Sequence, residues 1–191
     1  HEARNWRAIA LGTAGISVIV SLLAFFGLRN GDAGVPPVSS EPIHVGVLHS
    51  DSGPMAISEK PVKEATHLAI EEINAAGGVL GRPLKAVFAD GRSEPEVFAA
   101  EATKLIKNEK TVAIFGCWTS ASRKAVREVV QQHDVPLFYP VQFEGLEESP
   151  RIVYLGPTTN QQLMPALDFL TDQLHAKKIF LVGSNYVFPV A

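Results

Sequence analysis

From Ile43 onward, apolar positions follow two different patterns along the chain. Short, continuously apolar runs alternate with longer segments in which apolar residues recur every three or four positions, the spacing of one face of an α-helix. Continuously apolar runs of this length are typical of strands covered on both faces. The alternation predicts parallel βαβ units, and therefore an α/β fold with a doubly wound parallel sheet.

The pattern places individual elements along the chain. Strands are expected at residues 43–48, 84–89, 112–115, 135–138, 152–155 and 178–182. Helices are expected at residues 59–76, 95–107, 121–133 and 161–174. The apolar residues of the first helix share one face: Val62, Ala65, Leu68, Ala69, Ile73 and Ala76. Gly77 and Gly78 end this helix, since glycine readily adopts the left-handed conformation that follows helix ends.

The beginning of the chain has a different composition. Residues 8–28 form a stretch of 21 residues without a charge, flanked by Arg4, Arg7 and Arg29. As a helix this stretch would be about 30 Å long, the thickness of a bilayer's hydrocarbon core. We therefore expect a transmembrane anchor here. The positive charge before it predicts a cytoplasmic flank at residues 1–7, with the rest of the chain on the periplasmic or outer side.

A secretory signal peptide is the alternative interpretation of residues 8–28. Gly31-Asp32-Ala33 offers a small-residue cleavage site, but the apolar core of a signal peptide is usually only about 7–15 residues long. Residues 29–42 are rich in Gly, Pro and Ser and predict a linker that leads to a domain over residues 43–191. Because the chain starts at His1 and stops just after the last expected strand, we expect it to be truncated.

Charge and cysteine content argue against several classes of site. The formal net charge is -3, and the chain has no run of Lys and Arg, which argues against a nucleic-acid partner. Cys117 is the only cysteine, so no disulfide framework and no cysteine zinc cluster is expected. His44 and His49 lie on opposite faces of the first strand, so we expect no metal site, and His49 is interpreted as polar loop surface near the cleft.

The turns that follow the expected strands share a neutral, aromatic character. The turn after the third strand, Gly116 to Ser120, offers a Trp, hydroxyl groups and the free N–H groups of a helix start. The turns at residues 139–143 and 184–188 add further aromatic and neutral polar residues. Carboxyl ends of parallel strands meet at one edge of the sheet, where ligands bind. This lining fits a flat, neutral, polar ligand better than a phosphate or a sugar acid.

Six segments resemble the amide- and urea-binding branch of the type I periplasmic solute-binding proteins. They read VGVLHSDSG, AIEEINAAGGVLGRPL, FGCWTSASRKAV, LFYPVQFEGLEESPRIVYLGP, NQQLMPA and GSNYVFP. The pair GCWTSASRKAV and YPVQFEG is the most specific, because amino-acid-binding relatives share the fold but not this pair. The resemblance implies a two-lobed receptor that closes on urea or a short-chain amide, with residues 43–191 as its first lobe, truncated at the C-terminus.

The resemblance also implies a set of ligand contacts: Trp118, Ser120, Tyr139, Val141, Tyr186 and Phe188. Urea donates through two NH₂ groups and accepts at one carbonyl oxygen, so Ser120 and Gln142 are expected as acceptors and the helix start at Ser120 as the donor. Ser52, after the first strand, completes the predicted set. Val141 followed by Gln142 resembles the urea-type members. Phe188 stands where the family commonly has Tyr, which puts one hydroxyl contact in doubt.

Three functions remain open at this point. The receptor delivers its solute to an ABC permease, or it is the ligand-sensing domain of a membrane-anchored signalling protein. A remote alternative is an amide hydrolase that uses Cys117, which lies at the kind of strand-turn-helix corner where some hydrolases place a nucleophile. No G-x-S-x-G or G-x-C-x-G motif surrounds Cys117, so we interpret it as a small buried residue. Neither enzymatic activity nor a cofactor is expected.

Overall fold

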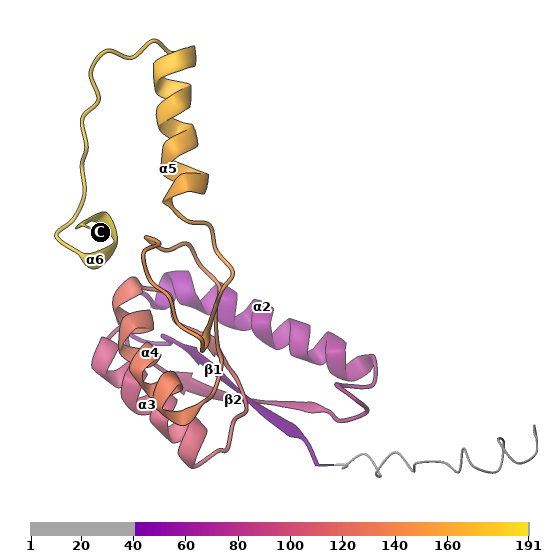
Figure 1. The fold of residues 1–191 in the computed structure, drawn as a ribbon. Helices are drawn as coiled ribbons and strands as arrows, with labels where there is room; N and C mark the ends of the chain where they lie inside the picture. Colours follow the sequence, from indigo (N-terminus) through magenta and orange to yellow (C-terminus); the bar gives the residue numbers. More distant parts are fainter. Residues whose placement is uncertain (1–40, 191) are drawn as a thin grey trace, which may run out of the picture. The chain divides into compact units, whose positions relative to one another are not determined.

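A computed structural model describes residues 41–190, and its helices and strands alternate along the chain (Figure 1). The strands are β1 (Ile43–His49), β2 (Leu84–Asp90), β3 (Ile114–Gly116), β4 (Leu137–Tyr139) and β5 (Ile152–Tyr154). The helices are α2 (Ala56–Ala75), α3 (Pro95–Lys107), α4 (Ser120–His133), α5 (Thr159–Asp168) and α6 (Val187–Val190). A π-helical turn, η1 (Phe169–Gln173), directly follows α5.

The five strands form one sheet in the order β2-β1-β3-β4-β5. Every neighbouring pair is parallel, and β1 pairs with β2 along its whole length, from Ile43 opposite Leu84 to His49 opposite Asp90. The predicted α/β fold with a parallel sheet is therefore confirmed. All five carboxyl ends point to one edge of the sheet, because the strands run in the same direction.

Helices cover β1 on both faces. Val45 and Val47 are buried with Ile70 of α2, whereas Leu48 belongs to the core cluster that includes α3 and α4. Gly46 lies between them on the α3 side, where an added Cβ would come within 3.0 Å of Leu105 Cδ1. This close approach explains why a glycine interrupts the apolar run of β1.

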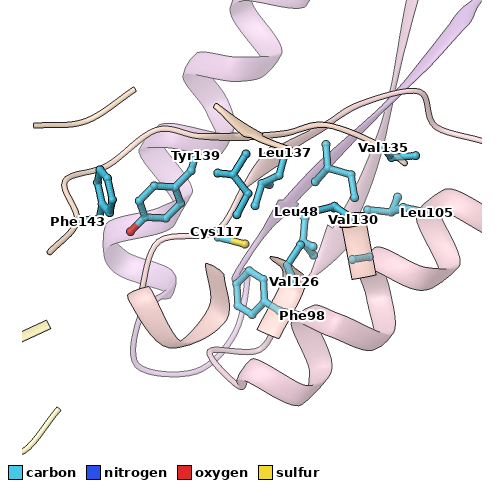
Figure 2. Close-up of a cluster of buried hydrophobic side chains, with 13 residues drawn as sticks. Leu48, Phe98, Leu105, Cys117, Val126, Val130, Val135, Leu137, Tyr139 and Phe143 are labelled. Atoms are coloured by element: carbon cyan, nitrogen blue, oxygen red, sulfur yellow. The ribbon is translucent and has the colours of Figure 1, made fainter. Parts of the chain in front are cut away.

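The larger core lies between the sheet and the helices α3 and α4, which pack against each other (Figure 2). Its fully buried members come from β1, α3, β3, α4, β4 and the turn after β3, and they include Leu48, Phe98, Ile114, Val126, Leu137 and Cys117. Because this core extends to Cys117, Tyr139 and Phe143, it supports the loops at the carboxyl edge of the sheet.

The predicted sixth strand at residues 178–182 is wrong. No strand forms there, and Phe180, Leu181 and Val182 are 89%, 86% and 87% exposed. A strand needs a hydrogen-bonded neighbour, and residues 41–190 offer none to this segment. The apolar run alone is therefore not enough to form a strand.

The first predicted helix is confirmed, but its predicted apolar face does not lie on the sheet. Leu68, Ala69 and Ile73 are exposed. The buried positions of α2 are Glu59 and Ile70, so the inward face follows a different set of residues. Periodicity predicted the helix correctly but did not predict its rotation about its own axis.

The predicted flank, anchor and most of the linker, at residues 1–7, 8–28 and 29–42, lie outside the described residues. Within residues 41–190, no helix has both the length and the hydropathy that a membrane crossing requires.

Candidate functional site

A pocket of about 280 Å³ lies at the carboxyl edge of the sheet. Four loops contribute to it: the loops after β1, β3 and β4, and the segment that leads into α6. Its lining residues all have neutral side chains, and they are Met55, Trp118, Thr119, Ser120, Tyr139, Gln142, Ser184, Tyr186, Phe188 and Pro189. The pocket therefore combines several aromatic rings with hydroxyl and amide groups and has no formal charge in its lining.

The turn between β3 and α4 has a tightly constrained backbone. An added Cβ at Gly116 would lie 2.0 Å from the carbonyl oxygen of Leu48, so only glycine fits there. Cys117 follows with a positive φ of 65°. Thr119 then caps α4, because its Oγ1 accepts a hydrogen bond from the backbone N–H of Ser122 at 3.1 Å. These constraints place Trp118 and Ser120 at the pocket.

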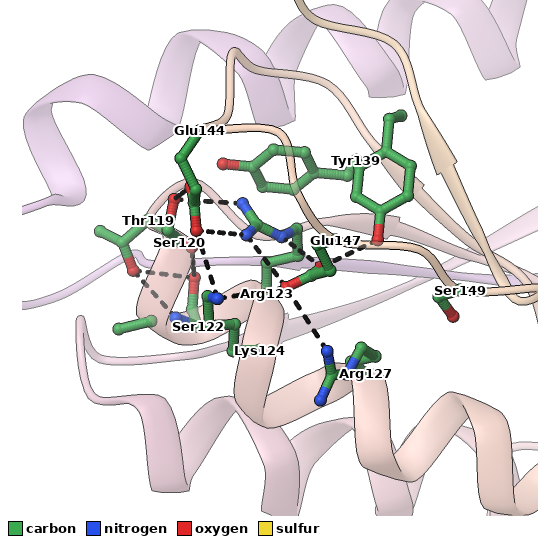
Figure 3. A network of polar contacts seen from close by, with 12 residues as sticks. Thr119, Ser120, Ser122, Arg123, Lys124, Arg127, Tyr139, Glu144, Glu147 and Ser149 are labelled. Atoms are coloured by element: carbon green, nitrogen blue, oxygen red, sulfur yellow. Dashed lines mark hydrogen bonds and ion pairs between the residues drawn. The ribbon is translucent and has the colours of Figure 1, made fainter. Parts of the chain in front are cut away.

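Ser120 is buried, and its hydroxyl is already engaged (Figure 3). It donates to Glu144 Oε2 at 2.7 Å and accepts from Arg123 Nη1 at 3.1 Å. The Ser120 oxygen is predicted to accept from a ligand NH₂ group, but it already accepts from Arg123. A hydroxyl oxygen has two lone pairs, so Ser120 can accept one further hydrogen bond from a ligand.

Arg123 joins α4 to the loop after β4 through a buried network (Figure 3). Its guanidinium donates from Nη2 to Glu144 Oε1 and from Nε to Glu147 Oε1, both at 2.9 Å. The same group stacks on the rings of Tyr139 and Phe143, with centroid distances of 5.0 and 5.3 Å. Lys124 and Arg127 form further ion pairs with these carboxylates. Both carboxylates are thus neutralised locally, and neither lines the pocket.

The ionisation of this network follows from its contacts. Burial disfavours the charged form of Glu144, but the Ser120 hydroxyl and the Arg123 guanidinium outweigh it and lower the pKa of this carboxyl to about 2. Burial likewise opposes the charge of Arg123, and its two carboxylate partners still raise the guanidinium pKa. Arg123 and Glu144 are therefore both charged at neutral pH.

Tyr139 connects two of the pocket loops. Its side chain is fully buried, and its hydroxyl lies 2.8 Å from the carbonyl oxygen of Trp118 and 3.3 Å from that of Gln142. The hydroxyl proton is thus committed to backbone acceptors. Tyr139 contributes its ring to the lining and positions Trp118 and Gln142.

The hydroxyl of Tyr186 lies over the start of α4. It accepts a hydrogen bond from the backbone N–H of Ala121 at 3.0 Å. One donor of the helix start, the N–H of Ala121, is therefore in use, whereas the N–H of Ser120 has no hydrogen-bond acceptor among residues 41–190. The proton of the Tyr186 hydroxyl has no acceptor among residues 41–190, so this group remains as a donor next to the pocket.

The pocket brings together six of the eight predicted site residues: Trp118, Ser120, Tyr139, Gln142, Tyr186 and Phe188. Val141 is not among them, because its side chain packs against the large core cluster. Ser52 is also absent, because it is exposed and its hydroxyl donates to Asp90 Oδ2 at 2.8 Å. Neither residue lines the pocket.

Sequence reasoning missed four lining residues: Met55, Thr119, Ser184 and Pro189. Thr119 carried a readable signal, since a Thr directly before a helix pattern is a typical N-cap. Met55 carried none, because the pattern started the first helix at Glu59 and the structure starts it at Ala56.

The interpretation of His49 as loop surface is wrong. It is the last residue of β1 and fully buried, with Nδ1 3.2 Å from Glu59 Oε2. The sheet places it beneath α2, whose inward face presents Glu59. Across residues 41–190, no group of three or more His, Cys, Asp or Glu side chains gathers in a way that could hold a metal ion.

Cys117 is completely buried. Burial and the nearby Glu59 carboxylate raise the pKa of its thiol well above the ordinary value. The thiolate is the nucleophilic form of cysteine, and the environment of Cys117 disfavours it. The geometry is that of a packing residue under the turn.

The comparisons with known proteins agree with this fold. A family model described as a periplasmic binding protein domain matches residues 43–191. An amino acid binding protein of Pseudomonas aeruginosa is 30% identical over 122 residues, which cover 60% of this chain and 31% of that protein.

Two solved structures are similar over most of the described region. One is the substrate-binding protein of a branched-chain amino acid transporter from Streptococcus pneumoniae, in complex with isoleucine. Its TM-score is 0.67 at 26% identity, covering 71% of this chain and 40% of that one. The other is an ABC transporter solute-binding protein from R. palustris in complex with 4-hydroxybenzoate. Its TM-score is 0.67 at 29% identity, covering 78% of this chain and 40% of that one.

The chain spans 31% to 40% of the length of these three relatives. Within that span, the likeness shows the fold of a type I periplasmic binding protein lobe. The urea- and amide-binding branch is not among the relatives described here, so this finer assignment remains a prediction.

Proposed function

We propose that this chain, which belongs to the periplasmic binding protein domain family, binds urea or a short-chain amide in the pocket at the carboxyl edge of its sheet. The proposed protein is an extracytoplasmic solute receptor and not an enzyme. Its ligand-contacting residues are Trp118, Tyr186, Phe188, Gln142 and Ser120, with Tyr139 holding two of the loops in place.

The observation that carries the proposal is the absence of formal charge from the pocket lining. Glu144 is the nearest candidate for a charged contact, and its carboxylate is instead bonded to Ser120 and Arg123. A charged ligand would lose its hydration without gaining an opposite charge, which is costly. A small neutral amide loses less, because aromatic rings can cover its plane and hydroxyl or amide groups can pair with its polar atoms.

An amino acid is the main rival ligand, since two of the relatives are described as an amino acid binding protein and an isoleucine complex. Its carboxylate would need donors such as the free N–H groups of a helix start. At α4 the N–H of Ala121 is bonded to Tyr186 and that of Ser122 to Thr119. The N–H of Ser120 has no acceptor among residues 41–190, so a carboxylate could bond to it, but to reach a second N–H of this helix start it would have to displace the Tyr186 hydroxyl. An amide carbonyl needs only one donor, which the Tyr186 hydroxyl supplies.

The proposed receptor serves as the substrate-binding component of an ABC transporter, as the R. palustris relative is described. The alternative output is a signalling protein that senses the same ligand. An uncleaved anchor at residues 8–28 favours this alternative, because a receptor that diffuses freely in the periplasm requires cleavage of this segment. Mapping the amino terminus of the mature protein distinguishes the two.

Calorimetric titration of the full-length two-lobed ectodomain with urea, acetamide and leucine tests the ligand assignment. We expect urea or acetamide to bind with a measurable heat, and leucine to give none. If leucine binds and urea and acetamide do not, the pocket is an amino acid site. If none of the three compounds binds, the proposed ligand class is contradicted, whereas the fold assignment is not affected.

A further inference from the structure

The opposite, amino edge of the sheet holds a second and larger cavity, of about 730 Å³. Its lining comes from the residues at the starts of β1 and β2 and from those that precede β3. Three of the lining residues are cations: Arg82, Lys85 and Lys110. Nothing in the proposed amide-binding function uses this edge.

These three cations form no ion pair with any residue between 41 and 190. Most other basic residues near the sheet do, including Lys63 with Asp51, and Arg151 with Asp134. Arg82 donates from Nε to the carbonyl oxygen of Glu41 at 2.9 Å, and its Nη1 has no partner among these residues. The cavity therefore has cationic side chains whose charge is not neutralised by the described part of the chain.

Other charged residues lie in or near this cavity. Lys107, in the last turn of α3, is exposed and has no ion-pair partner within residues 41–190. Glu41 lines the cavity and has an interaction of its own. Glu109 is adjacent, with its backbone carbonyl oxygen 2.9 Å from His44 Nδ1. The cavity lining itself has three cations against the one carboxylate of Glu41, so its balance is positive, although the whole chain has a net charge of -3.

We propose that this amino edge docks on an anionic lipid surface, with Arg82, Lys85 and Lys110 binding the phosphate groups of the lipid headgroups. Basic residues near an anionic membrane are attracted to it, and the flexible stems of lysine let the charge reach the surface.

The order of the chain favours a membrane over a soluble anion as the partner. β1 begins at this edge, and only 14 residues, 29–42, separate the uncharged stretch 8–28 from Ile43. If a bilayer holds residues 8–28, as the sequence predicts, the chain joins the domain to it at this edge.

The test is lysine footprinting of the full chain in nanodiscs of phosphatidylcholine, with and without phosphatidylglycerol. We expect Lys85, Lys107 and Lys110 to react with an amine-modifying reagent about fivefold more slowly in the phosphatidylglycerol discs. Salt at high concentration should remove the difference, because it screens surface charge. The exposed Lys60 and Lys178 serve as internal controls and should react at the same rate in both discs.

A double variant tests whether the protection depends on these lysines or only on closeness to the membrane. Lys85→Gln with Lys110→Gln should abolish the protection of Lys107, whereas Lys60→Gln with Lys178→Gln should retain it. Equal reaction rates in both kinds of disc would overturn the proposal. Protection by inorganic phosphate in discs without phosphatidylglycerol would also overturn it, because the site would then take a soluble anion. The double variant should bind urea normally, since neither lysine lines the other pocket.

Discussion

At the scale of single residues, the pocket depends on hydroxyl groups, and some of these already donate their protons within the protein. Of the three predicted contacts that bear a hydroxyl, Tyr139 and Ser120 donate their protons to Trp118 and Glu144, and only Tyr186 has no acceptor among residues 41–190. These three side chains can be identified in the sequence as candidates. Their division into positioning and donating groups cannot, because it depends on hydrogen-bond partners that are distant in sequence.

Tyr186→Phe tests the donating role. The variant keeps the ring but removes the hydroxyl, so the ligand carbonyl loses a donor and the Ala121 N–H loses its acceptor. We expect urea affinity to fall about tenfold, which corresponds to one hydrogen bond of about 1.4 kcal/mol. Calorimetric titration measures the change. Tyr154→Phe is the matched control, since its hydroxyl bonds Glu147 and does not line the pocket. An unchanged affinity for Tyr186→Phe would exclude the hydroxyl from the contact.

The buried carboxylate Glu144 predicts a pH dependence of stability. Its pKa is lowered to about 2 in the folded state from an ordinary 4.5. A lowered folded-state pKa contributes stability above pH 4.5, and this contribution is lost as the pH falls toward 2. We expect a loss on the order of 2 kcal/mol in the free energy of unfolding across this window. Guanidinium chloride denaturation should be used, because urea is the proposed ligand.

Glu144→Gln should make the acid limb of that profile shallower. Glu148→Gln is the control, because Glu148 is exposed and makes no ion pair with residues 41–190. If the profile keeps its slope in Glu144→Gln, the network around Arg123 does not hold a charged Glu144.

At the scale of elements, sequence patterns located the elements but did not orient all of them. Five of the six predicted strands are present, and α3 has its predicted bounds. For α2, the alanine-rich face was the stronger apolar signal, yet Glu59 and Ile70 face inward. Glu59 faces inward because its carboxylate contacts His49 and accepts a hydrogen bond from the backbone N–H of Ser50. The apolar periodicity of the helix does not predict these contacts.

Asn74 fixes the path from α2 into β2. Its side-chain amide donates to the carbonyl oxygen of Leu84 at 2.8 Å and accepts from the N–H of the same residue at 2.7 Å. Asn74→Ala leaves both backbone groups of Leu84 without these partners, so we expect the free energy of unfolding to fall by about 1–3 kcal/mol.

Asn108→Ala is the matched control, because Asn108 also lies at the end of a helix but its exposed side chain makes no hydrogen bond with residues 41–190. Its effect should stay within about 0.5 kcal/mol. Guanidinium chloride denaturation measures both variants, and equal effects would mean that the two bonds of Asn74 contribute nothing specific.

At the scale of the whole molecule, the two edges of the sheet have different chemistry. The carboxyl edge has a neutral, partly aromatic pocket, and the amino edge has a cavity with unpaired cations. The first was predictable, because ligand sites of parallel α/β sheets lie at the carboxyl ends of strands. The second was not, because Lys110 is distant in sequence from Arg82 and Lys85 and comes near them only through the strand order β2-β1-β3.

The most direct test of the central claim is the fluorescence of Trp118 during titration with urea. The chain has two tryptophans, so Trp6→Phe leaves Trp118 as the only one. The account predicts a saturable change in emission at urea concentrations far below those that unfold proteins, with acetamide acting similarly and leucine having no effect. A purely linear response to urea, or a saturable response to leucine alone, would contradict it.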